Sequence, residues 1–379
     1  MSSFEYMKEI VPKIIGYRLS RFGLIKPPMP VNFTISITNM CNSKCKTCNV
    51  WRIYKDNPKA RERELSIDEI EKIFKSIGHT YFFNISGGEP FMRNDFPEII
   101  DLGCKYLTPK IIHTPTNALM PERIEKTTEE IMKRINKHDS SIQFTIKPSF
   151  DGVGDKHDNI RGVKGNFKKL MDTIERLNKL KKKYPNLHVG IGTVISKFSI
   201  PHLKETVEFS KKMGVDSYIN EIAENRSELF NLKDDITPGW KEYRDAIRIF
   251  SQESRRLLKK SKGLDRMVLS MRLVYYDLAV KILREKRQVI PCYSGYANAH
   301  ISPFGDVWPC CILGYSKSMG NLRDADYDFK MIWVSKRARN VRKFIKDKNC
   351  SCPLANIALT NMICSPRYLL KIMKNFIFG

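Results

Sequence analysis

The sequence has no apolar run long enough to span a lipid bilayer, which takes about 20 consecutive apolar residues. Its first residues also lack the apolar segment and small-residue cleavage site of a secretory signal peptide. No internal repeat and no low-complexity stretch interrupts the 379 residues. These absences exclude a membrane-spanning protein, a chain secreted by its own signal and a repeat protein. We therefore expect a cytoplasmic chain, peripheral to a membrane at most.

Acidic residues are few: 41 Asp and Glu stand against 66 Lys and Arg, a formal net charge of +25. A field of that sign attracts anionic partners such as nucleic acid, phospholipid headgroups or an acidic protein. A lysine-rich surface that is merely solvated would explain the same charge, so the partner stays open. With 42% hydrophobic and 28% charged residues, the composition is otherwise that of a globular protein with room for two or three domains.

Cysteines are abundant. The chain has ten, and in a cytosolic protein that number indicates metal or redox chemistry rather than disulfides. Nine of them fall into two groups, one early and one late in the sequence. The tenth, Cys104, stands alone inside an expected helix, and we interpret it as a core residue.

The early group is Cys41, Cys45 and Cys48, with the spacing C-x3-C-x2-C. Three thiolates at this spacing can fill three corners of a [4Fe–4S] cluster and leave the fourth iron without a protein ligand. An open iron can bind and activate a substrate, whereas a fully ligated cluster only passes electrons. Zinc sites and ferredoxin-like clusters use similar spacings, so the triplet alone does not decide between them.

Strand-like and helix-like segments alternate between residues 31 and 225. Helices are expected to begin at Ser66, which can form a capping box with Glu69, and at Pro121 and Pro201. The strand candidates are 33–37, 81–85, 110–114, 142–148, 187–195 and 215–222. Six strand–helix units in series predict a parallel sheet curved into a partial (β/α)6 barrel. The cysteine triplet then follows the first strand, at the face where barrel sites lie.

The chain changes character twice after residue 225. A helical and basic stretch, with a second long helix over 268–287, gives way near Pro291 to a turn-rich, cysteine-bearing segment. We expect five parts: 1–30, a basic amphipathic helix; 31–225, the partial barrel; 226–290, a basic helical segment; 291–365, a small cysteine-rich domain; and 366–379, a basic amphipathic tail.

Three motifs together resemble the radical S-adenosylmethionine (SAM) superfamily. Besides the cysteine triplet, Ser86-Gly87-Gly88-Glu89-Pro90 follows the second expected strand. The string from Ser149-Phe150-Asp151-Gly152 through His157-Asp158 and Arg161-Gly162 to Gly165-Asn166-Phe167 is similar to the fourth-strand region of one subgroup. That subgroup carries an auxiliary-cluster domain called SPASM or, when shortened, twitch. The resemblance covers about residues 31–364 and implies an α/β fold: a partial barrel, a helical segment and a SPASM/twitch-like domain.

The resemblance implies an enzyme in which Cys41, Cys45 and Cys48 hold a [4Fe–4S] cluster that chelates SAM. An electron from a reductant such as ferredoxin or flavodoxin then cleaves SAM into methionine and a 5'-deoxyadenosyl radical. That radical abstracts hydrogen from an unactivated C–H bond of the substrate. The cofactor carries the chemistry, and the protein binds, orients and excludes side reactions.

The resemblance also assigns SAM-binding residues. Gly87, Gly88, Glu89 and Pro90 are expected at SAM's amino group, where the glycines let the backbone approach and Glu89 accepts a hydrogen bond. Candidates for the ribose and the methionine carboxylate are Asn117, Ser149 and Arg161. Many family members have an aromatic residue just before the third cysteine, where this chain has Thr47; Trp51 is a candidate to cover part of the cluster.

The late cysteine group is Cys292, Cys310, Cys311, Cys350, Cys352 and Cys364. Its opening, with Pro303-Phe304-Gly305 and Trp308-Pro309-Cys310, is similar to a SPASM or twitch domain, but the closing part has fewer cysteines than the full pattern. We expect one auxiliary [4Fe–4S] cluster, held by Cys292, Cys310 and two of Cys350, Cys352 and Cys364. Cys311, beside Cys310, is interpreted as a bystander. A zinc site on the same residues is the alternative.

The first and last segments of the sequence are basic and amphipathic. Apolar residues recur at helical spacing at Phe4, Met7, Ile10, Val11, Ile14 and Ile15, and the segment 367–379 mixes Leu, Ile, Met and Phe with lysine. Helices of this kind can lie in a membrane interface, or they can dock onto the barrel. We favour a lipid-facing role for the last thirteen residues.

The sequence gives less information about the substrate than about the cofactors. Peptide maturases of this subgroup often carry a leader-peptide-binding domain before the barrel, whereas only forty residues precede Cys41 here. With the charge and the amphipathic segments, this favours a membrane lipid or another anionic amphiphile, modified by C–C bond formation or on its alkyl chain. The alternative is a peptide- or protein-modifying SPASM maturase. A tRNA-modifying enzyme and a non-catalytic iron–sulfur electron carrier are weaker hypotheses, and no nucleic-acid partner is expected because no RNA-binding module is visible.

Overall fold

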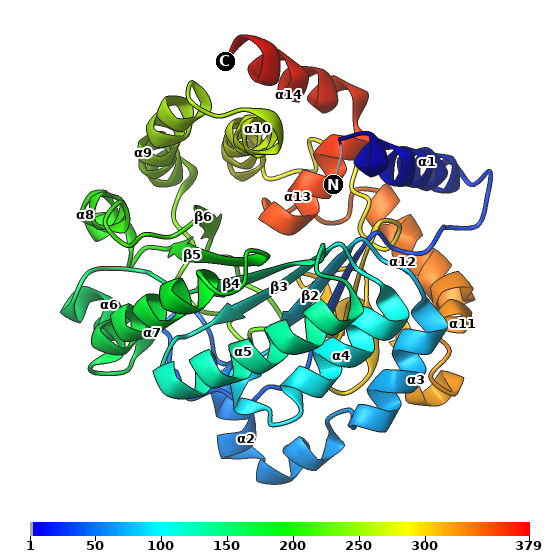
Figure 1. Cartoon of the computed structure of the whole chain (residues 1–379). Coiled ribbons are helices and arrows are strands. Elements are labelled where there is room, and N and C mark those ends of the chain that lie inside the picture. The colour runs from blue at the N-terminus through cyan, green and yellow to red at the C-terminus, as the bar shows by residue number, and fades with distance from the viewer. Residues whose placement is uncertain (1–2) are drawn as a thin grey trace.

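The computed structural model describes residues 3–379, with side chains from Lys8 onward. Phe4 and Met7 of the N-terminal amphipathic pattern therefore lie outside the described side chains. The chain forms a mixed α/β structure in which helices cover a single twisted sheet (Figure 1). The predicted fold class is confirmed.

The sheet has nine strands in the described chain, in the spatial order β6-β5-β4-β3-β2-β1-β7-β8-β9. Their bounds are β1 Asn32–Ser36, β2 Phe82–Ser86, β3 Ile111–Thr116, β4 Gln143–Pro148, β5 Leu187–Ile195, β6 Ser217–Ile222, β7 Asn298–Ile301, β8 Asp306–Trp308 and β9 Gly320–Asn321. The six predicted strands are all present and pair in parallel, each within a few residues of its expected bounds.

A seventh parallel strand extends this sheet, and the sequence did not predict it. β7 pairs with the free side of β1, in a register that places Asn298 opposite Asn32 and Ile301 opposite Ile35. β8 and β9 then continue the sheet in antiparallel fashion. The cysteine-rich C-terminal part therefore shares one sheet with the barrel instead of forming a separate layer.

Helices α3 Ile67–Ile77, α4 Phe96–Leu107, α5 Pro121–His138, α7 Asn166–Lys181 and α8 Leu203–Ser210 follow the barrel strands and surround the sheet (Figure 1). The short helices α2 Ile53–Asp56 and α6 Asp155–Arg161 lie at the carboxyl ends of the strands. The capping box is confirmed, since Ser66 Oγ accepts from the Glu69 amide and Glu69 Oε2 accepts from the Ser66 amide. α5 begins at Pro121 as predicted, but Pro201 lies in a 3-10 turn and α8 begins after it, at Leu203.

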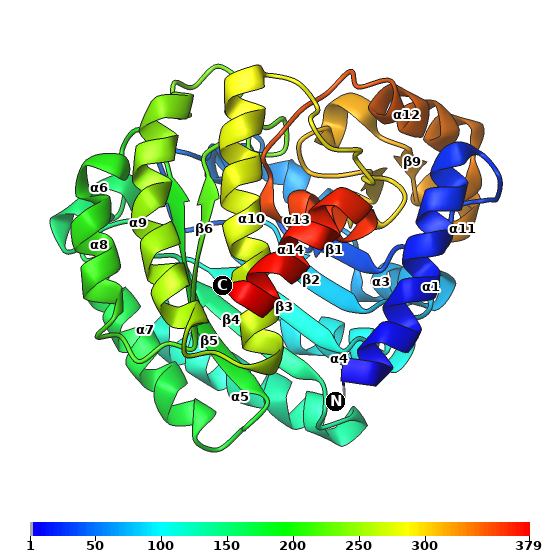
Figure 2. The same ribbon diagram turned by 90° about the horizontal axis from the view of Figure 1, so that it is seen from above.

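The remaining helices are α1 Ser3–Phe22, α9 Trp240–Leu258, α10 Gly263–Glu285, α11 Phe329–Val334, α12 Lys336–Lys346, α13 Ala355–Cys364 and α14 Pro366–Phe378. α10 begins five residues before the predicted helix. Viewed from above, α1, α13, α14 and α10 lie together over the amino ends of the strands (Figure 2). This helical layer is opposite the edge of the sheet where the cysteine loop lies.

The main core packs between the sheet and α3–α5. Phe33 stacks on Phe83, and Phe74 meets both rings edge-on. Cys104 lies in the same core with 4% of its surface exposed, which confirms its assignment as a packing residue. Within the described residues, no helix is both long enough and apolar enough to cross a membrane.

Candidate active site

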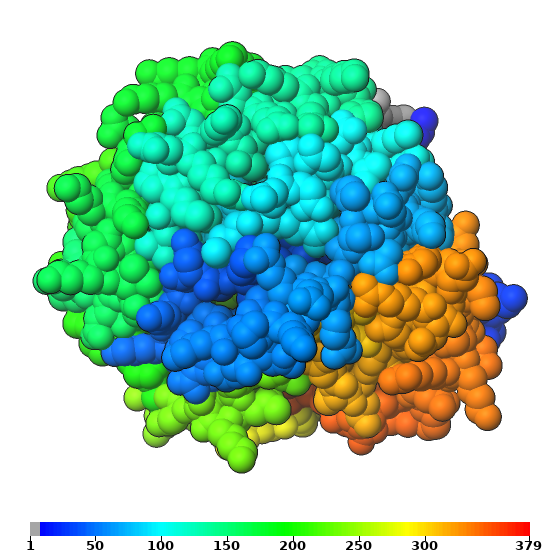
Figure 3. Space-filling view, turned by 90° about the horizontal axis from the view of Figure 1, so that it is seen from below, coloured from blue at the N-terminus to red at the C-terminus, as the bar shows by residue number. Residues whose placement is uncertain are grey.

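The loop Cys41–Cys48 follows β1 at the carboxyl end of the sheet, and the end of α6 holds it in place. The amide of Lys44 donates to the carbonyl oxygen of Arg161 at 3.1 Å. Gly162, which ends α6 at φ +70°, has no room for a side chain because a Cβ there would overlap the Lys44 carbonyl. In the view from below, the blue part of the chain that includes this loop and α2 lies across the middle of the face (Figure 3). The loop is therefore fixed by backbone contacts before any ligand is considered.

The thiols of this loop are poorly suited to carry charge on their own. Burial, together with the nearby Glu89 carboxylate and Cys45 thiol, raises the pKa of Cys41 to about 12. Burial and the neighbouring thiols raise the pKa of Cys48 further still. A bound cation reverses this logic, because a coordinating thiol is deprotonated outright. The three thiols therefore fit a positively charged group such as an iron cluster.

Among the residues that the structure describes, no three His, Cys, Asp or Glu side chains converge closely enough to hold one metal ion. A [4Fe–4S] cube is larger than a single ion and keeps its thiolates further apart.

Gly87 and Gly88 are required by contacts within the chain. The Gly88 amide donates to the Thr38 carbonyl, and the Glu89 amide donates to the Met40 carbonyl, both at 2.7 Å. A Cβ on Gly87 would overlap the Thr38 oxygen, and one on Gly88 would overlap the Met40 oxygen. The glycines therefore bring this segment against the residues that immediately precede Cys41.

Glu89 is fully buried, and the protein occupies its carboxylate. Its oxygens accept hydrogen bonds from Thr116 Oγ1 at 2.9 Å, the Asn117 amide at 2.6 Å and the Phe91 amide at 3.2 Å. Burial raises the pKa of this carboxyl group to about 7, although the three hydrogen bonds oppose the shift. Pro90, also buried, starts a 3-10 turn directly after it. In this arrangement Glu89 joins the ends of β2 and β3.

Asn117 and Ser149 lie at the ends of neighbouring strands. Asn117 Nδ2 donates to Asn42 Oδ1 at 2.7 Å and lies 3.7 Å from Cys41 Sγ. The Ser149 amide donates to the Thr116 carbonyl, and its side chain lines the interior of the barrel. Asn117 is therefore against the cysteine loop, whereas Ser149 faces the space where a ligand would lie.

Arg161 is paired inside the protein. Its Nη1 donates to Asp151 Oδ2 at 3.2 Å, and both side chains are nearly buried. Its Nε has no hydrogen-bond partner in the described chain. Burial opposes its charge, but the Cys45 and Cys41 thiols and Asp151 more than offset this, so the pKa of Arg161 lies above its usual value. The guanidinium thus lies beneath the cysteine loop and keeps one donor free for a ligand.

Trp51, the candidate to cover part of the cluster, contacts the third cysteine. Its Nε1 donates to the Cys48 carbonyl at 3.1 Å, and the Arg52 guanidinium stacks on the indole. On the other side of the loop, the Thr47 carbonyl accepts from Asn231 Nδ2 at 2.8 Å.

Four of the late cysteines are close enough to alter one another's pKa. Besides burial, Cys292 and Cys350 raise the pKa of the Cys310 thiol, and Cys310 and Cys292 raise the pKa of the Cys352 thiol. Burial is the main cause that raises the pKa of Cys310 and of Cys350, to about 12 in each case. These four thiols therefore lie near one another and are the candidates for a second donor set.

Cys364 lies apart from that set, and Cys311 borders it, because Cys310 is among the groups that raise the pKa of the Cys311 thiol. Cys364 ends α13 and packs with Tyr17 and Tyr293 in the small core beneath α1. Cys311 lines the barrel cavity, as Cys310 does, and Arg226 Nη1 lies 3.7 Å from its sulfur. The four-cysteine set is therefore Cys292, Cys310, Cys350 and Cys352.

A cavity of about 400 Å³ lies inside the barrel, and Cys310 and Cys311 are the cysteines that line it. Ser86 and Ser149 line it near the strand ends, while Cys310 and Cys311 line it from the C-terminal domain. α13 contributes Asn356 and Ile357 to the lining. A group bound here would lie beside Cys310 and Cys311 and near the carboxyl ends of β2 and β4.

Charged and polar side chains gather in this cavity, and the sequence analysis did not identify them. Lys147 lines it with a pKa lowered by burial, and Arg226 lies 3.7 Å from the Glu224 carboxylate. The side-chain oxygens of Asn220 and Asn298 have no hydrogen-bond partner within the described chain. Such unsatisfied groups fit a polar ligand such as SAM or the polar part of a substrate. A polar residue at an inward position of an apolar strand, such as Lys147, is the signal that could have predicted this lining.

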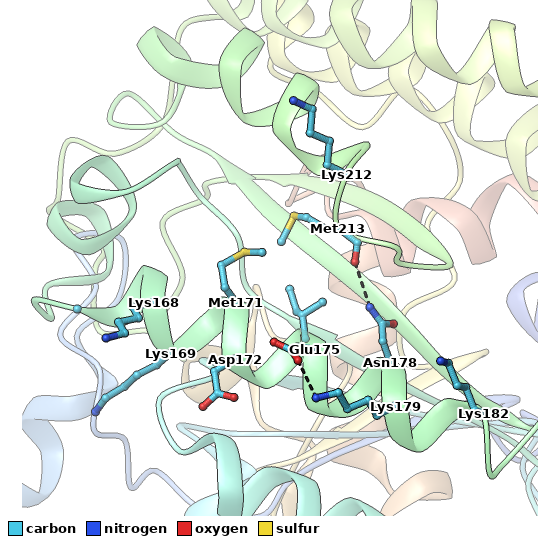
Figure 4. A pocket seen from close by; sticks show the side chains of 12 residues that line it. Lys168, Lys169, Met171, Asp172, Glu175, Asn178, Lys179, Lys182, Lys212 and Met213 are labelled. Carbon is cyan, nitrogen blue, oxygen red and sulfur yellow. Dashed lines mark hydrogen bonds and ion pairs between the residues drawn. The ribbon is translucent and has the colours of Figure 1, made fainter.

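A larger hollow, of about 960 Å³, lies on the outside of the barrel and contains none of the predicted site residues. It runs along α7 towards Met213, with Lys168, Lys169 and Lys182 around it and a Glu175–Lys179 ion pair on the helix surface (Figure 4). Because no predicted site residue lines this hollow, it is not part of the candidate active site.

Comparisons with known proteins agree with this arrangement. A radical SAM superfamily model matches residues 35–210, and a model of the SPASM iron–sulfur cluster-binding domain matches residues 292–353. The second match includes the four-cysteine set and stops before Cys364.

Relatives of known name span most of the chain. The antilisterial bacteriocin subtilosin biosynthesis protein AlbA of Bacillus subtilis is 24% identical over 90% of this chain and 70% of its own length. The AdoMet-dependent heme synthase of Methanosarcina barkeri is 25% identical over 78% of this chain and 80% of its own. The solved structure of Streptococcus suis SuiB bound to S-adenosylmethionine has a TM-score of 0.58 at 17% identity, over 86% of this chain and 70% of that one, which is a likeness of fold.

Together the two domains imply a SAM-binding [4Fe–4S] cluster, SAM itself and auxiliary iron–sulfur binding. The thiols of the Cys41–Cys48 loop and the four-cysteine set fit those cofactors, and the predicted family is confirmed. The chain belongs to the radical SAM superfamily and is an enzyme of the group that carries a SPASM domain.

Proposed function

We propose that this radical SAM enzyme modifies a peptide, at a C–H bond presented inside the barrel. The observation that carries the proposal is the cavity of about 400 Å³, which touches the strand ends below the cysteine loop and also Cys310 and Cys311.

The relatives support a peptide substrate over a lipid. AlbA, a bacteriocin biosynthesis protein, matches 90% of the chain, and other matched relatives are also peptide-modifying maturases. The comparisons give no support to the membrane-lipid substrate that charge and amphipathic segments favoured. The heme synthase match leaves a small-molecule substrate as the alternative.

In this proposal the residues divide the work. Cys41, Cys45 and Cys48 hold the SAM-binding cluster, and Cys292, Cys310, Cys350 and Cys352 hold the auxiliary one. When bound, these cofactors supply one-electron chemistry that protein side chains lack.

The remaining site residues position and enclose the cofactors and substrate. Glu89 and Asn117 fix the strand ends against the cysteine loop, and Arg161 offers its free Nε–H to an anionic group. Lys147 on β4 and Ser149 just after it line the cavity and face the bound molecules.

The test is anaerobic coexpression of the chain with each short peptide encoded beside its gene, followed by mass spectrometry of the peptide. One peptide should change mass, and the purified enzyme should release 5'-deoxyadenosine from SAM in the presence of a strong reductant. A Cys45→Ala variant should lose both activities. Cys104→Ala is the matched control and should keep both, because that cysteine lies in the core.

Two results would refute the proposal. If every peptide stays unmodified while a porphyrin precursor is consumed with SAM, the substrate is a small molecule. If SAM is not cleaved at all, the assignment of Cys45 fails as well.

A further inference from the structure

α14 exposes an apolar stripe flanked by cations. Tyr368 and Ile372 pack inward against the helical core, whereas Leu370, Ile377 and Phe378 are exposed by 71%, 58% and 80%. The residues 366–379 include three Lys or Arg and no Asp or Glu. The basic side chains Arg367, Lys371 and Lys374 are all exposed.

The turn between α9 and α10 has the same composition and lies beside α14. Arg266 joins them, since its guanidinium donates to the carbonyl oxygens of Phe376 at 2.5 Å and Gly379 at 2.7 Å. In residues 257–264, Leu257 and Leu264 are exposed, and the segment has three lysines and no acidic residue. The α9–α10 turn and α14 therefore form one surface, which we call the basic face.

α1 adds a further apolar stripe within the same helical layer (Figure 2). Ile10 and Tyr17 pack inward, while Val11, Ile15, Leu19 and Phe22 recur at helical spacing on the outer side. Their exposed fractions run from 36% to 72%. Large apolar side chains are therefore exposed to solvent on three segments of the layer, namely α14, the α9–α10 turn and α1.

We propose that the basic face docks on an anionic lipid surface, with α1 beside it in the interface. Amphipathic helices with lysine on the polar flank and Leu or Phe on the other lie in the headgroup region in this way. Lysine stems can cover apolar surface while their ammonium groups reach the phosphates.

Charge and apolar exposure together select this partner. Nucleic acid would pair with the lysines but leave Leu370, Phe378 and Leu264 exposed to water. A second copy of the chain would bring the six Lys and Arg of one basic face against six like charges of the other. An anionic bilayer satisfies both the cations and the apolar side chains.

Docking in this position leaves the active site accessible. The basic face lies over the amino ends of the strands, opposite the cysteine loop and α2 (Figure 1). The lipid is therefore an attachment surface in this proposal, and the peptide substrate enters from the other side. The docking proposal does not rest on the proposed function.

The test is flotation of the reconstituted full chain, without SAM or peptide, on two kinds of vesicle. At low salt the wild type should float with vesicles of equal parts phosphatidylcholine and phosphatidylglycerol, but not with phosphatidylcholine alone. Leu264→Glu with Leu370→Glu should weaken binding by about tenfold or more, since each replaces an exposed leucine that would enter the lipid with a charge that the anionic surface repels. Met331→Glu, at a site 60% exposed on α11, is the matched control and should float like the wild type.

Three results would overturn the proposal. The first is wild type that stays below the anionic vesicles at low salt. The second is equal flotation of the double variant and the wild type. In the third, light scattering shows a dimer that the double variant converts to a monomer without any flotation, which would assign the face to a second copy.

Discussion

At the scale of single residues, the Arg161–Asp151 pair is the most consequential contact beneath the cysteine loop. Asp151→Asn keeps an oxygen for the Val194 amide but leaves the Arg161 charge without its carboxylate. Because both side chains are nearly buried, we expect the free energy of unfolding to fall by about 3 kcal/mol, measured by urea denaturation.

The matched control for that prediction is a surface pair. Glu205→Gln breaks the ion pair between Glu205 and Lys156, in which both side chains are about half exposed. It should lower the free energy of unfolding by less than about 1 kcal/mol. Equal losses in the two variants would contradict a special role for the buried pair.

The late cysteines give a second residue-scale prediction. In a chain whose Cys41, Cys45 and Cys48 are all alanine, Cys352→Ala should lower the iron and sulfide bound per chain. Cys364→Ala should leave both unchanged and lower the unfolding free energy by about 1 kcal/mol, because it only loses packing beneath α1. If Cys364→Ala loses iron and Cys352→Ala does not, the four-cysteine set is wrong.

The sequence predicted ligand types better than their environment. Spacing identified the cysteines, but it could not show that Glu89 is enclosed by Thr116, Asn117 and Phe91, or that Arg161 has Asp151 as partner. Such pairings depend on how strand ends meet in space, which short motifs do not encode.

At the scale of elements, the start of α3 links the barrel to the C-terminal domain. Glu69 caps α3 through the Ser66 amide, and its carboxylate also receives the Arg323 guanidinium at 2.6 Å and the Tyr327 hydroxyl at 2.8 Å. The hydrogen bond from Arg323 is the main cause that lowers the pKa of Glu69 to about 2.

This lowered pKa predicts a pH dependence with a definite sign. A carboxyl group whose pKa falls on folding stabilises the protein above its unfolded pKa of about 4.5 and loses that contribution as pH falls towards about 2. Glu69→Gln should therefore lower the unfolding free energy by about 1 kcal/mol at neutral pH. The difference from wild type, measured by thermal unfolding, should shrink between about pH 5 and about pH 3. A constant difference over that interval would contradict the assignment.

Local patterns predicted elements well where they are self-contained. The six barrel strands, the Ser66 capping box and the start of α5 follow from periodicity and cap residues. β7 did not, because its four residues are uniformly buried and its partner β1 is distant in sequence. Likewise, Pro201 marks a turn whose helix begins only at Leu203.

At the scale of the whole molecule, the two domains are not separable. A chain that ends at residue 290 lacks β7, so the edge of β1 is left unpaired and part of the core is uncovered. We expect this fragment to aggregate, although it retains all six barrel strands. Size-exclusion chromatography of the refolded fragment checks this, and a stable monomer would contradict it.

Because β1 pairs with both β2 and β7, its sheet cannot be completed until late in translation. β1 is among the first elements to be translated, but Asn298, which lies opposite Asn32, follows hundreds of residues later. At about 5–20 residues per second, the nascent chain keeps one side of that strand open for some tens of seconds. Shielding of this edge on the ribosome, and the yield of folded enzyme, will therefore depend on translation rate and on chaperones that bind extended segments.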